Sequence, residues 1–380
     1  MEKPNYQKLW EQRRFSWYVG VAGSSVWMLA DVPIQEFYKK PTSCIEAYRR
    51  GRLLLKELFG PDVPVPPVST PMIKYGHLNT LGAELYFPEA GEPCTKFLFE
   101  SAEEGIKYLK RKVDFATAGM APFYLDFYKI MQNAFPDERV YFGWQWEGPV
   151  TTAWGLLGET FMYDLFDKPD VLHEFLQLST ASVVDFCQFF CRVENTKVLD
   201  SEPDHGRLCD DIAAMIPAAL WEEFVLPYWG MYYDGPVPGR IVHCEDMKPA
   251  QLPYLEKESI VDYDPGVSPN LNPAIIRAAT PVPFGWRLAV NHYRSMSLQS
   301  VVDFVYQAVA DGASYVFTFV EADMCQESTA EKVRAFIAAA KQAKRLLSKG
   351  VSRKEIGQRV YARGAKKFLR QLAIGSVHKE

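Results

Sequence analysis

The chain has 380 residues, 48% hydrophobic and 23% charged, and this composition excludes an intrinsically disordered protein. Its net charge of −5 argues against nucleic acid as a partner, because proteins that bind nucleic acid usually carry a basic stripe. We find no apolar leader and no apolar run near the roughly 20 residues of a membrane span, so we expect a cytoplasmic protein without a membrane partner.

The N-terminal segment, residues 1–62, is expected to form a mostly helical extension outside the main domain. Its aromatic cluster of Phe15, Trp17, Tyr18 and Trp27 indicates packing against the rest of the chain or against a second copy. We therefore expect this segment to be a cap or a dimer element, which makes a homodimer possible.

Residues 63–348 alternate between short strand-like runs and longer helical stretches, the pattern of βα units around parallel strands. The predicted strands are 66–70, 113–117, 139–146, 196–201, 240–245, 259–264, 283–290 and 314–320. The predicted helices are 151–165, 169–193, 217–232, 249–256, 273–278, 297–310 and 329–347. Eight strands predict an α/β fold of the (β/α)8 TIM-barrel type. The competing doubly wound sheet lacks support, because no glycine-rich fingerprint follows a strand.

The C-terminal segment, residues 349–380, is expected to be a basic helical extension. Ser352 and Glu355 have the spacing of a capping box, and residues 351–380 carry eight Lys or Arg against two Glu. Such a helix either docks a partner protein or packs on its own domain, and the sequence leaves both open.

The strand 240–245 ends in a cluster of metal-binding residue types. Because side chains alternate along a strand, His243 and Glu245 share one face and Cys244 takes the other, as a buried thiol. Cys325 follows the strand 314–320, at the same end of the predicted barrel. His243, Glu245 and Cys325 therefore form a candidate catalytic zinc site with one open position.

Further polar and aromatic residues follow other strands. Asp210 and Asp211 are candidates for substrate binding or proton donation, with surface capping as the alternative. Candidate substrate-binding residues are Trp144, Trp146, Glu147, Asn291 and His292, although the aromatic ones also fit a large core. Glu147, Asn291, His292 and the cluster Glu202, Asp204 and His205 are alternatives to Glu245 as third ligand.

Four segments resemble the uroporphyrinogen decarboxylase superfamily, a set of (β/α)8 barrels that includes decarboxylases and zinc-dependent, corrinoid-linked methyltransferases. Residues 148–158 (GPVTTAWGLLG) are similar to its Gly-Pro-Phe-Thr stretch, and residues 163–170 (YDLFDKPD) to its Asp-Pro-Glu helix entry. Residues 221–227 (WEEFVLP) and the segment from Cys325 through 329–335 (TAEKVRA) resemble two later segments, the second one from the methyltransferases.

The resemblance implies a zinc-dependent methyltransferase that works with a corrinoid carried by a separate protein. In the thiol methyltransferases of this superfamily zinc is held by His-x-Cys and a distant Cys, which places His243 and Cys325 as ligands and Glu245 in the position of the middle Cys. A carboxylate makes zinc harder and more Lewis acidic. We therefore expect O-demethylation of a methoxylated aromatic, with transfer of the methyl group to a Co(I) corrinoid.

Three other functions remain open at the level of sequence. They are a thiol methyltransferase that uses methyl-corrinoid, a decarboxylase of the uroporphyrinogen type, and a non-catalytic barrel that binds a tetrapyrrole. The decarboxylase is disfavoured because Arg13 and Arg14 are the nearest counterpart of the Arg-Gln-Ala-Gly-Arg-type loop with which decarboxylases hold their substrate.

Overall fold

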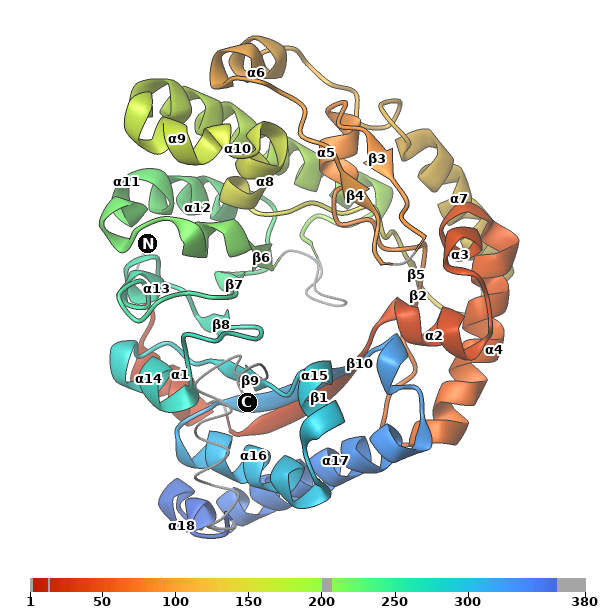
Figure 1. Ribbon diagram of the computed structural model, residues 1–380, viewed down its shortest axis with the longest axis vertical. Coiled ribbons are helices and arrows are strands. Elements are labelled where there is room, and N and C mark those ends of the chain that lie inside the picture. Colours follow the sequence, from red (N-terminus) through yellow and green to blue (C-terminus); the bar gives the residue numbers. More distant parts are fainter. Residues whose placement is uncertain (1–2, 13, 90, 200–206, 361–380) are drawn as a thin grey trace. The chain divides into compact units, whose positions relative to one another are not determined.

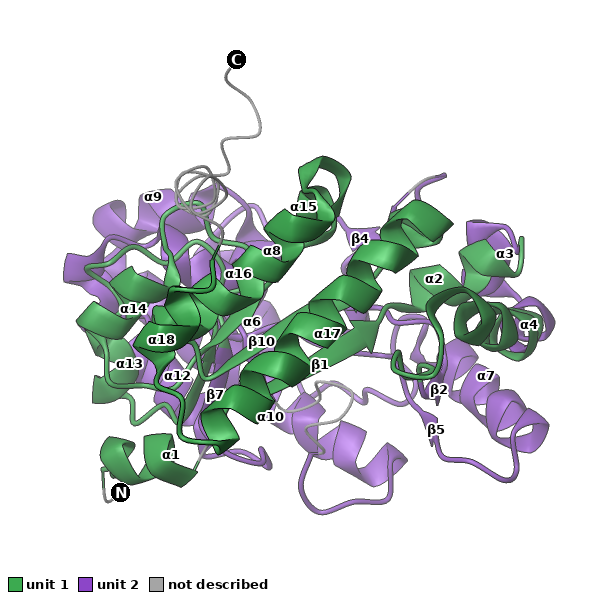
Figure 2. Cartoon of the chain, turned by 90° about the horizontal axis from the view of Figure 1, so that it is seen from below, with its two compact units in different colours: residues 1–31, 46–66, 243–380 green, residues 32–45, 67–242 purple. Residues whose placement is uncertain are grey.

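The structure is a computed structural model that describes residues 3–12, 14–89, 91–199 and 207–360. Strands and helices alternate along most of the chain (Figure 1). The chain divides into two compact units, of which unit 1 comprises residues 1–31, 46–66 and 243–380, and unit 2 comprises residues 32–45 and 67–242 (Figure 2).

Unit 1 is built around parallel strands. β1 (Ser16–Val21) pairs in parallel with β10 (Tyr315–Val320), and β10 pairs in parallel with β9 (Gly285–Arg287). A parallel bridge from Tyr263 to Phe284 connects β9 to β8 (Asp262–Asp264). Unit 1 also contains His243, the last residue of β7 (Ile241–His243). The residues of β10 are buried almost throughout, which is typical of parallel strands covered on both faces.

The helices of unit 1 cover this sheet with amphipathic faces. In α17 (Glu327–Ser348) the buried residues recur every three or four positions, and α17 packs on α16 (Leu298–Ala310). The other helices of the unit are α1 (Tyr6–Gln12), α2 (Gly23–Leu29), most of α4 (Pro41–Phe59), α13 (Pro253–Lys257), α14 (Pro273–Ala279), α15 (Val290–Ser295) and α18 (Arg353–Gly357). The predicted capping box is confirmed, because Ser352 and Glu355 exchange both hydrogen bonds at the start of α18.

Unit 2 contains short strands and the longest helix. β2 (Val68–Ser69) pairs in parallel with β5 (Val140–Tyr141), β3 (Leu85–Tyr86) and β4 (Cys94–Thr95) form an antiparallel hairpin, and β6 (Leu208–Cys209) follows later. The predicted helix 169–193 is confirmed as α10. The remaining helices are α3 (Ile34–Lys39), α5 (Gly76–Thr80), α6 (Ala102–Leu109), α7 (Ala121–Ala134), α8 (Pro149–Leu157), α9 (Thr160–Asp167), α11 (Trp221–Phe224) and α12 (Leu226–Tyr233).

Three expectations about the elements are wrong. Residues 1–62 are not simply a helical extension, because β1 lies within them and pairs with β10. Residues 113–117 form a turn, since the Asp114 carboxylate accepts hydrogen bonds from the Ala116 amide and the Thr117 hydroxyl and so competes with strand pairing. The described part of 196–201 is not a strand, and the strand in this region is β6 instead.

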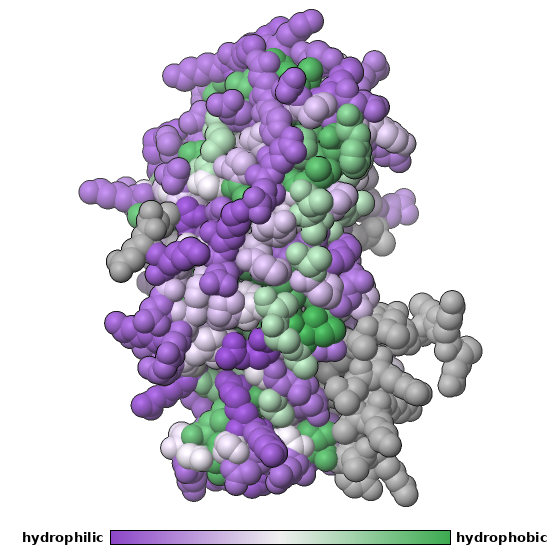
Figure 3. Space-filling view, turned by 90° about the vertical axis from the view of Figure 1, so that its left-hand side faces the viewer, coloured by the Kyte–Doolittle hydropathy of each residue, from purple (hydrophilic) through white to green (hydrophobic). Residues whose placement is uncertain are grey.

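The surface shown in Figure 3 is mostly hydrophilic, with hydrophobic residues in small separate patches. Among the helices within the described ranges, none has both the length and the apolar character that crossing a bilayer requires. Of the C-terminal segment, residues 361–380 lie outside the described residues, so the prediction of a basic helix is tested only as far as α18.

Candidate active site

The candidate site lies at the C-terminal ends of the strands of unit 1. His243 is the last residue of β7, and its neighbours Val242 and Cys244 are fully buried. The Cys244 amide donates to the Asp264 carbonyl at 3.2 Å, which ties the end of β7 to the end of β8. The expected alternation is confirmed, since Cys244 is a core thiol while the His243 side chain is partly exposed.

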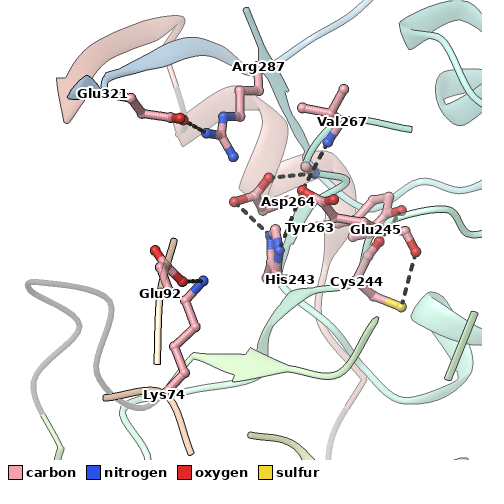
Figure 4. A network of polar contacts seen from close by, with 11 residues as sticks. Lys74, Glu92, His243, Cys244, Glu245, Tyr263, Asp264, Val267, Arg287 and Glu321 are labelled. Carbon is pink, nitrogen blue, oxygen red and sulfur yellow. Dashed lines mark hydrogen bonds and ion pairs between the residues drawn. The ribbon is translucent and has the colours of Figure 1, made fainter. Parts of the chain in front are cut away.

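Asp264 and Glu245 flank the imidazole of His243 (Figure 4). Nδ1 of His243 lies 3.2 Å from Oδ2 of Asp264, and Nε2 lies 3.9 Å from Oε1 of Glu245. A carboxylate that accepts from Nδ1–H fixes the tautomer and leaves Nε2 for the reacting side. Asp264 is itself held, because its Oδ1 accepts from the Gly266 amide at 2.8 Å.

Gly266 allows the loop after β8 to approach Glu245. Oε1 of Glu245 accepts from the Val267 amide at 3.2 Å, and a Cβ at position 266 would lie 2.1 Å from the same oxygen. Gly266 also has a φ of +56°, in the left-handed region that favours glycine. Asp246, directly after Glu245, has a φ of +60° and turns the chain away from the strand.

An ion pair occupies the ends of the next two strands. The Arg287 guanidinium of β9 donates to Oε1 of Glu321, the residue after β10, at 2.7 Å, and its charge lies over the Phe319 ring at 5.1 Å. Asp264, Arg287 and Glu321 are functional candidates that sequence reasoning missed. The signal was present, because Asp264 ends one predicted strand, Arg287 lies in another and Glu321 follows a third.

Cys325 does not join the other two predicted ligands in one group. It ends the short turn Ala322–Met324, and its thiol donates to the Glu321 carbonyl at 3.6 Å. Burial raises the pKa of this thiol, against a lowering hydrogen bond with Ser25. Within the described ranges no three His, Cys, Asp or Glu side chains gather as metal ligands would. Of the three predicted zinc ligands, His243 and Glu245 therefore lie together, and Cys325 does not lie with them. The binding of zinc stays a prediction.

Asp210 is a buried structural carboxylate in unit 2. It accepts hydrogen bonds from the Val150 and Thr151 amides at the start of α8 and from the Trp229 indole at 2.7 Å. Burial raises the pKa of Asp210 to about 6 against these hydrogen bonds, which lower it. These contacts assign Asp210 to holding α8 in place, whereas Asp211 beside it is exposed.

The predicted aromatic substrate residues are not equivalent. Trp144 is fully buried and stacks on Tyr124 at 4.7 Å, which is the packing of a core residue, and its contact with substrate stays a prediction. Trp146 is half-buried and its indole donates to the Tyr232 hydroxyl at 3.3 Å. Glu147 is half-buried and its carbonyl accepts from the Thr152 hydroxyl at 3.0 Å.

Asn291 and His292 lie in α15, directly after β9 and in the same unit as Arg287. Asn291 is exposed, while Nδ1 of His292 accepts from the Ala289 amide at 3.2 Å. Burial, and then the charge of Arg287, lower the pKa of His292. The third cluster of alternatives, Glu202, Asp204 and His205, lies outside the described residues.

Comparison with known proteins identifies the family and the fold. A family model described as uroporphyrinogen decarboxylase (URO-D) matches residues 38–264. Among solved structures, a methyltransferase from Methanosarcina mazei is similar with a TM-score of 0.59 and 15% sequence identity, over 86% of this chain and 92% of that chain. No curated protein matches. The predicted fold class, an α/β fold of the (β/α)8 barrel type, is confirmed.

Proposed function

Because this chain belongs to the uroporphyrinogen decarboxylase family, we propose that it is a methyltransferase that takes a methyl group from a small methylated molecule. The favoured donor is a methoxylated aromatic, and the acceptor is the Co(I) corrinoid of a partner protein. The observation that carries the proposal is the arrangement of Asp264, His243 and Glu245 at the ends of β7 and β8, where barrel enzymes hold their reacting groups.

The proposed reaction breaks the bond between the methyl carbon and the substrate oxygen. The methyl carbon bonds to the nucleophilic acceptor, and the oxygen keeps the electron pair and later takes a proton. His243 suits the position next to this oxygen, because Asp264 fixes Nδ1 and leaves Nε2 for a hydrogen bond or proton transfer. The imidazolium form of His243 supplies that proton from Nε2, and Glu245 beside Nε2 orients it.

Arg287 and Glu321 supply the groups that would orient the substrate. The Arg287 guanidinium is largely buried, is paired with Glu321, and lies over the Phe319 ring. A cation beside an aromatic ring suits a flat substrate that carries a negative charge after the methyl group leaves.

The proposal includes two further predictions, that the protein binds zinc and that it acts with a corrinoid protein. In a zinc-bound form His243 and Glu245, the two donors that lie together, would be metal ligands instead of proton groups, and zinc would supply Lewis acidity at the leaving oxygen in place of that proton. We expect one zinc per chain if a residue other than Cys325 completes the ligand set, because Cys325 does not group with these two donors. Metal analysis of the purified protein and of the His243→Ala variant tests this separately from activity.

The activity test supplies free Co(I) corrinoid and follows its absorption as the cobalt becomes methylated. We expect methylation with methoxylated aromatics, loss of at least about 100-fold in rate with His243→Ala, and little change with His173→Ala. His173 is a matched control, because it is a half-exposed histidine stacked on Phe224 in unit 2.

Other outcomes separate the alternatives. Methylation by methylated thiols but not by methoxyarenes would replace the oxygen donor by a sulfur donor. Release of carbon dioxide from uroporphyrinogen without methyl transfer would replace the proposal by decarboxylation. Full activity of His243→Ala would contradict the assignment of the site.

A further inference from the structure

We propose that unit 1 carries a second binding site, for a small organic anion with a flat ring, at the N-terminal ends of β9 and β10. The site is a cleft of about 480 Å³ formed by α1, α14, α18 and the segment before β9, and all these elements belong to unit 1 (Figure 2). Its volume falls in the range of about 300 to 1,000 Å³ that is usual for small-molecule sites.

Two guanidinium groups line the cleft. Arg277 comes from the last turn of α14 and Arg353 from the first residue of α18. Among the described residues no carboxylate forms an ion pair with either of them. Burial, and then the charge of Arg277, lower the pKa of Arg353, so the two charges act on each other. Like charges held side by side repel each other, and an anion between them relieves this repulsion. Arginine forks also match the oxygens of phosphate and carboxylate groups.

Both arginines are held in place by the fold. Arg277 lies over the Trp10 ring at 4.6 Å, and its aliphatic part packs on Gly312, where a Cβ would meet it at 3.0 Å. Arg353 donates through one nitrogen to the carbonyls of Val309 and Ala313 at 2.7 and 2.9 Å. These contacts orient the side chains before any ligand binds, which lowers the entropic cost of binding.

Aromatic and polar groups complete the cleft. Trp10 is fixed by its indole hydrogen bond to the Pro281 carbonyl at 2.7 Å, and Tyr6 contributes a buried hydroxyl for which the described part of the chain offers no hydrogen-bond partner. Tyr6 and Trp10 offer apolar surface to a flat ring, and the Tyr6 hydroxyl needs an acceptor. Among the described residues that line the cleft, Glu11 is the carboxylate, and it accepts from the Gln7 amide at 3.0 Å. A second carboxylate, Glu256, lies near enough to Tyr6 for its charge to act on the hydroxyl.

This cleft is separate from the candidate active site. The carbonyl that anchors Trp10 precedes β9, and one of the carbonyls bound by Arg353 precedes β10. Arg287 and Glu321 lie at the opposite ends of the same strands. Since a strand rises about 3.3 Å per residue, the six residues of β10 separate the two sites by roughly 17 Å.

The test is calorimetric titration of the whole chain with four probes: adenosine 5′-monophosphate, benzoate, inorganic phosphate and neutral adenosine. We expect at least one of the two ring anions to bind about tenfold more tightly than both inorganic phosphate and adenosine. The first two probes distinguish a phosphate ligand from a carboxylate ligand. No binding by either ring anion up to about 10 mM, or equal binding of adenosine or phosphate, would overturn the proposal.

Variants locate the binding. Arg277→Gln should weaken binding of the ring anion by about tenfold or more, whereas Arg345→Gln, an exposed arginine of α17, should not change it. We substitute Arg277 and not Arg353 in this test, because Arg277 is exposed, whereas Arg353 caps a helix and its loss would also affect stability. His243→Ala should keep the affinity. Unchanged binding by Arg277→Gln, or loss with His243→Ala, would show that the anion binds elsewhere.

Discussion

At the scale of single residues, Asp264 is the positioning group of the proposed reaction. Asp264→Asn replaces an acceptor with an amide that can turn its NH2 group towards Nδ1 of His243, which favours the wrong tautomer. We expect kcat/KM to fall about 10- to 100-fold and its pH profile to shift, with little loss of stability. Asp62→Asn, which removes an exposed partner of Lys341, is the control, and equal effects of the two would contradict a positioning role.

The close approach of Gly266 to the Glu245 carboxylate leads to a second prediction, about stability. Gly266→Ala places a methyl group 2.1 Å from Oε1 of Glu245 at a positive φ, so it should disturb the backbone and displace the carboxylate. The matched control is Gly60→Ala, at a φ of +81° with nothing within 4 Å of the new Cβ. Urea unfolding should show a loss of about 1 kcal/mol for Gly60→Ala and about 2 kcal/mol more for Gly266→Ala. Equal losses would mean that the loop adjusts without cost.

The buried carboxyl group of Asp210 should make the free energy of unfolding depend on pH. Its pKa is raised by burial to about 6 in the folded protein, above the ordinary value near 4 of the unfolded chain. The folded state therefore binds the extra proton, and this contribution is complete below about pH 4 and is lost as the pH rises through about 6. Asp210→Asn should remove this dependence, of order 3 kcal/mol, in unfolding free energies measured from pH 4 to 8. The exposed neighbour Asp211→Asn should leave it intact.

At the scale of elements, Arg353 connects α18 to the end of α16. Arg353→Met removes two hydrogen bonds to the Val309 and Ala313 carbonyls, and we expect the free energy of unfolding to fall by about 2 kcal/mol. Lys354→Met, at an exposed position of the same helix, should stay within about 0.5 kcal/mol of the parent protein. Thermal or urea unfolding measures the free energy of unfolding of both variants. A similar loss for both would contradict the capping role of Arg353.

The elements predicted best from sequence are those with a long or clear periodicity. α10 shows apolar residues every three or four positions over 25 residues, and both of its ends were predicted. β1 was missed because Phe15, Trp17 and Tyr18 were interpreted as the aromatic cluster of a helical cap, and the strand that pairs with β1, β10, lies far along the chain. β6 is only two residues long, too short to show any alternation.

Only the part of the candidate site that depends on local sequence was predicted, as was the case for the helices and strands. His243 and Glu245 follow from one strand and its alternation, which is local information. Asp264 and Arg287 act through neighbouring strands, and their distances to His243 and Glu321 depend on strand order and register. The third predicted ligand, Cys325, does not group with His243 and Glu245 within the described ranges, because residue spacing alone does not determine whether distant segments converge.

At the scale of the whole molecule, truncations test which part of the chain the fold needs. A chain that ends at Val360 keeps every described contact, so its melting temperature should stay within about 2 °C of the parent protein. A chain that ends at Ala313 lacks β10 and α17, and it should lose cooperative melting because β1 and β9 lose their shared partner. A large loss with the first truncation would assign a structural role to residues 361–380.

The pairing of β1 with β10 also has a consequence for folding during synthesis on the ribosome. Ser16 is paired with Tyr315, so the first strand is synthesised long before its partner. At a translation rate of about 5 to 20 residues per second, the roughly 300 intervening residues take about 15 to 60 seconds. During this interval the nascent chain exposes an aromatic strand without its native neighbour, and a chaperone that shields such segments would raise the yield of folded protein.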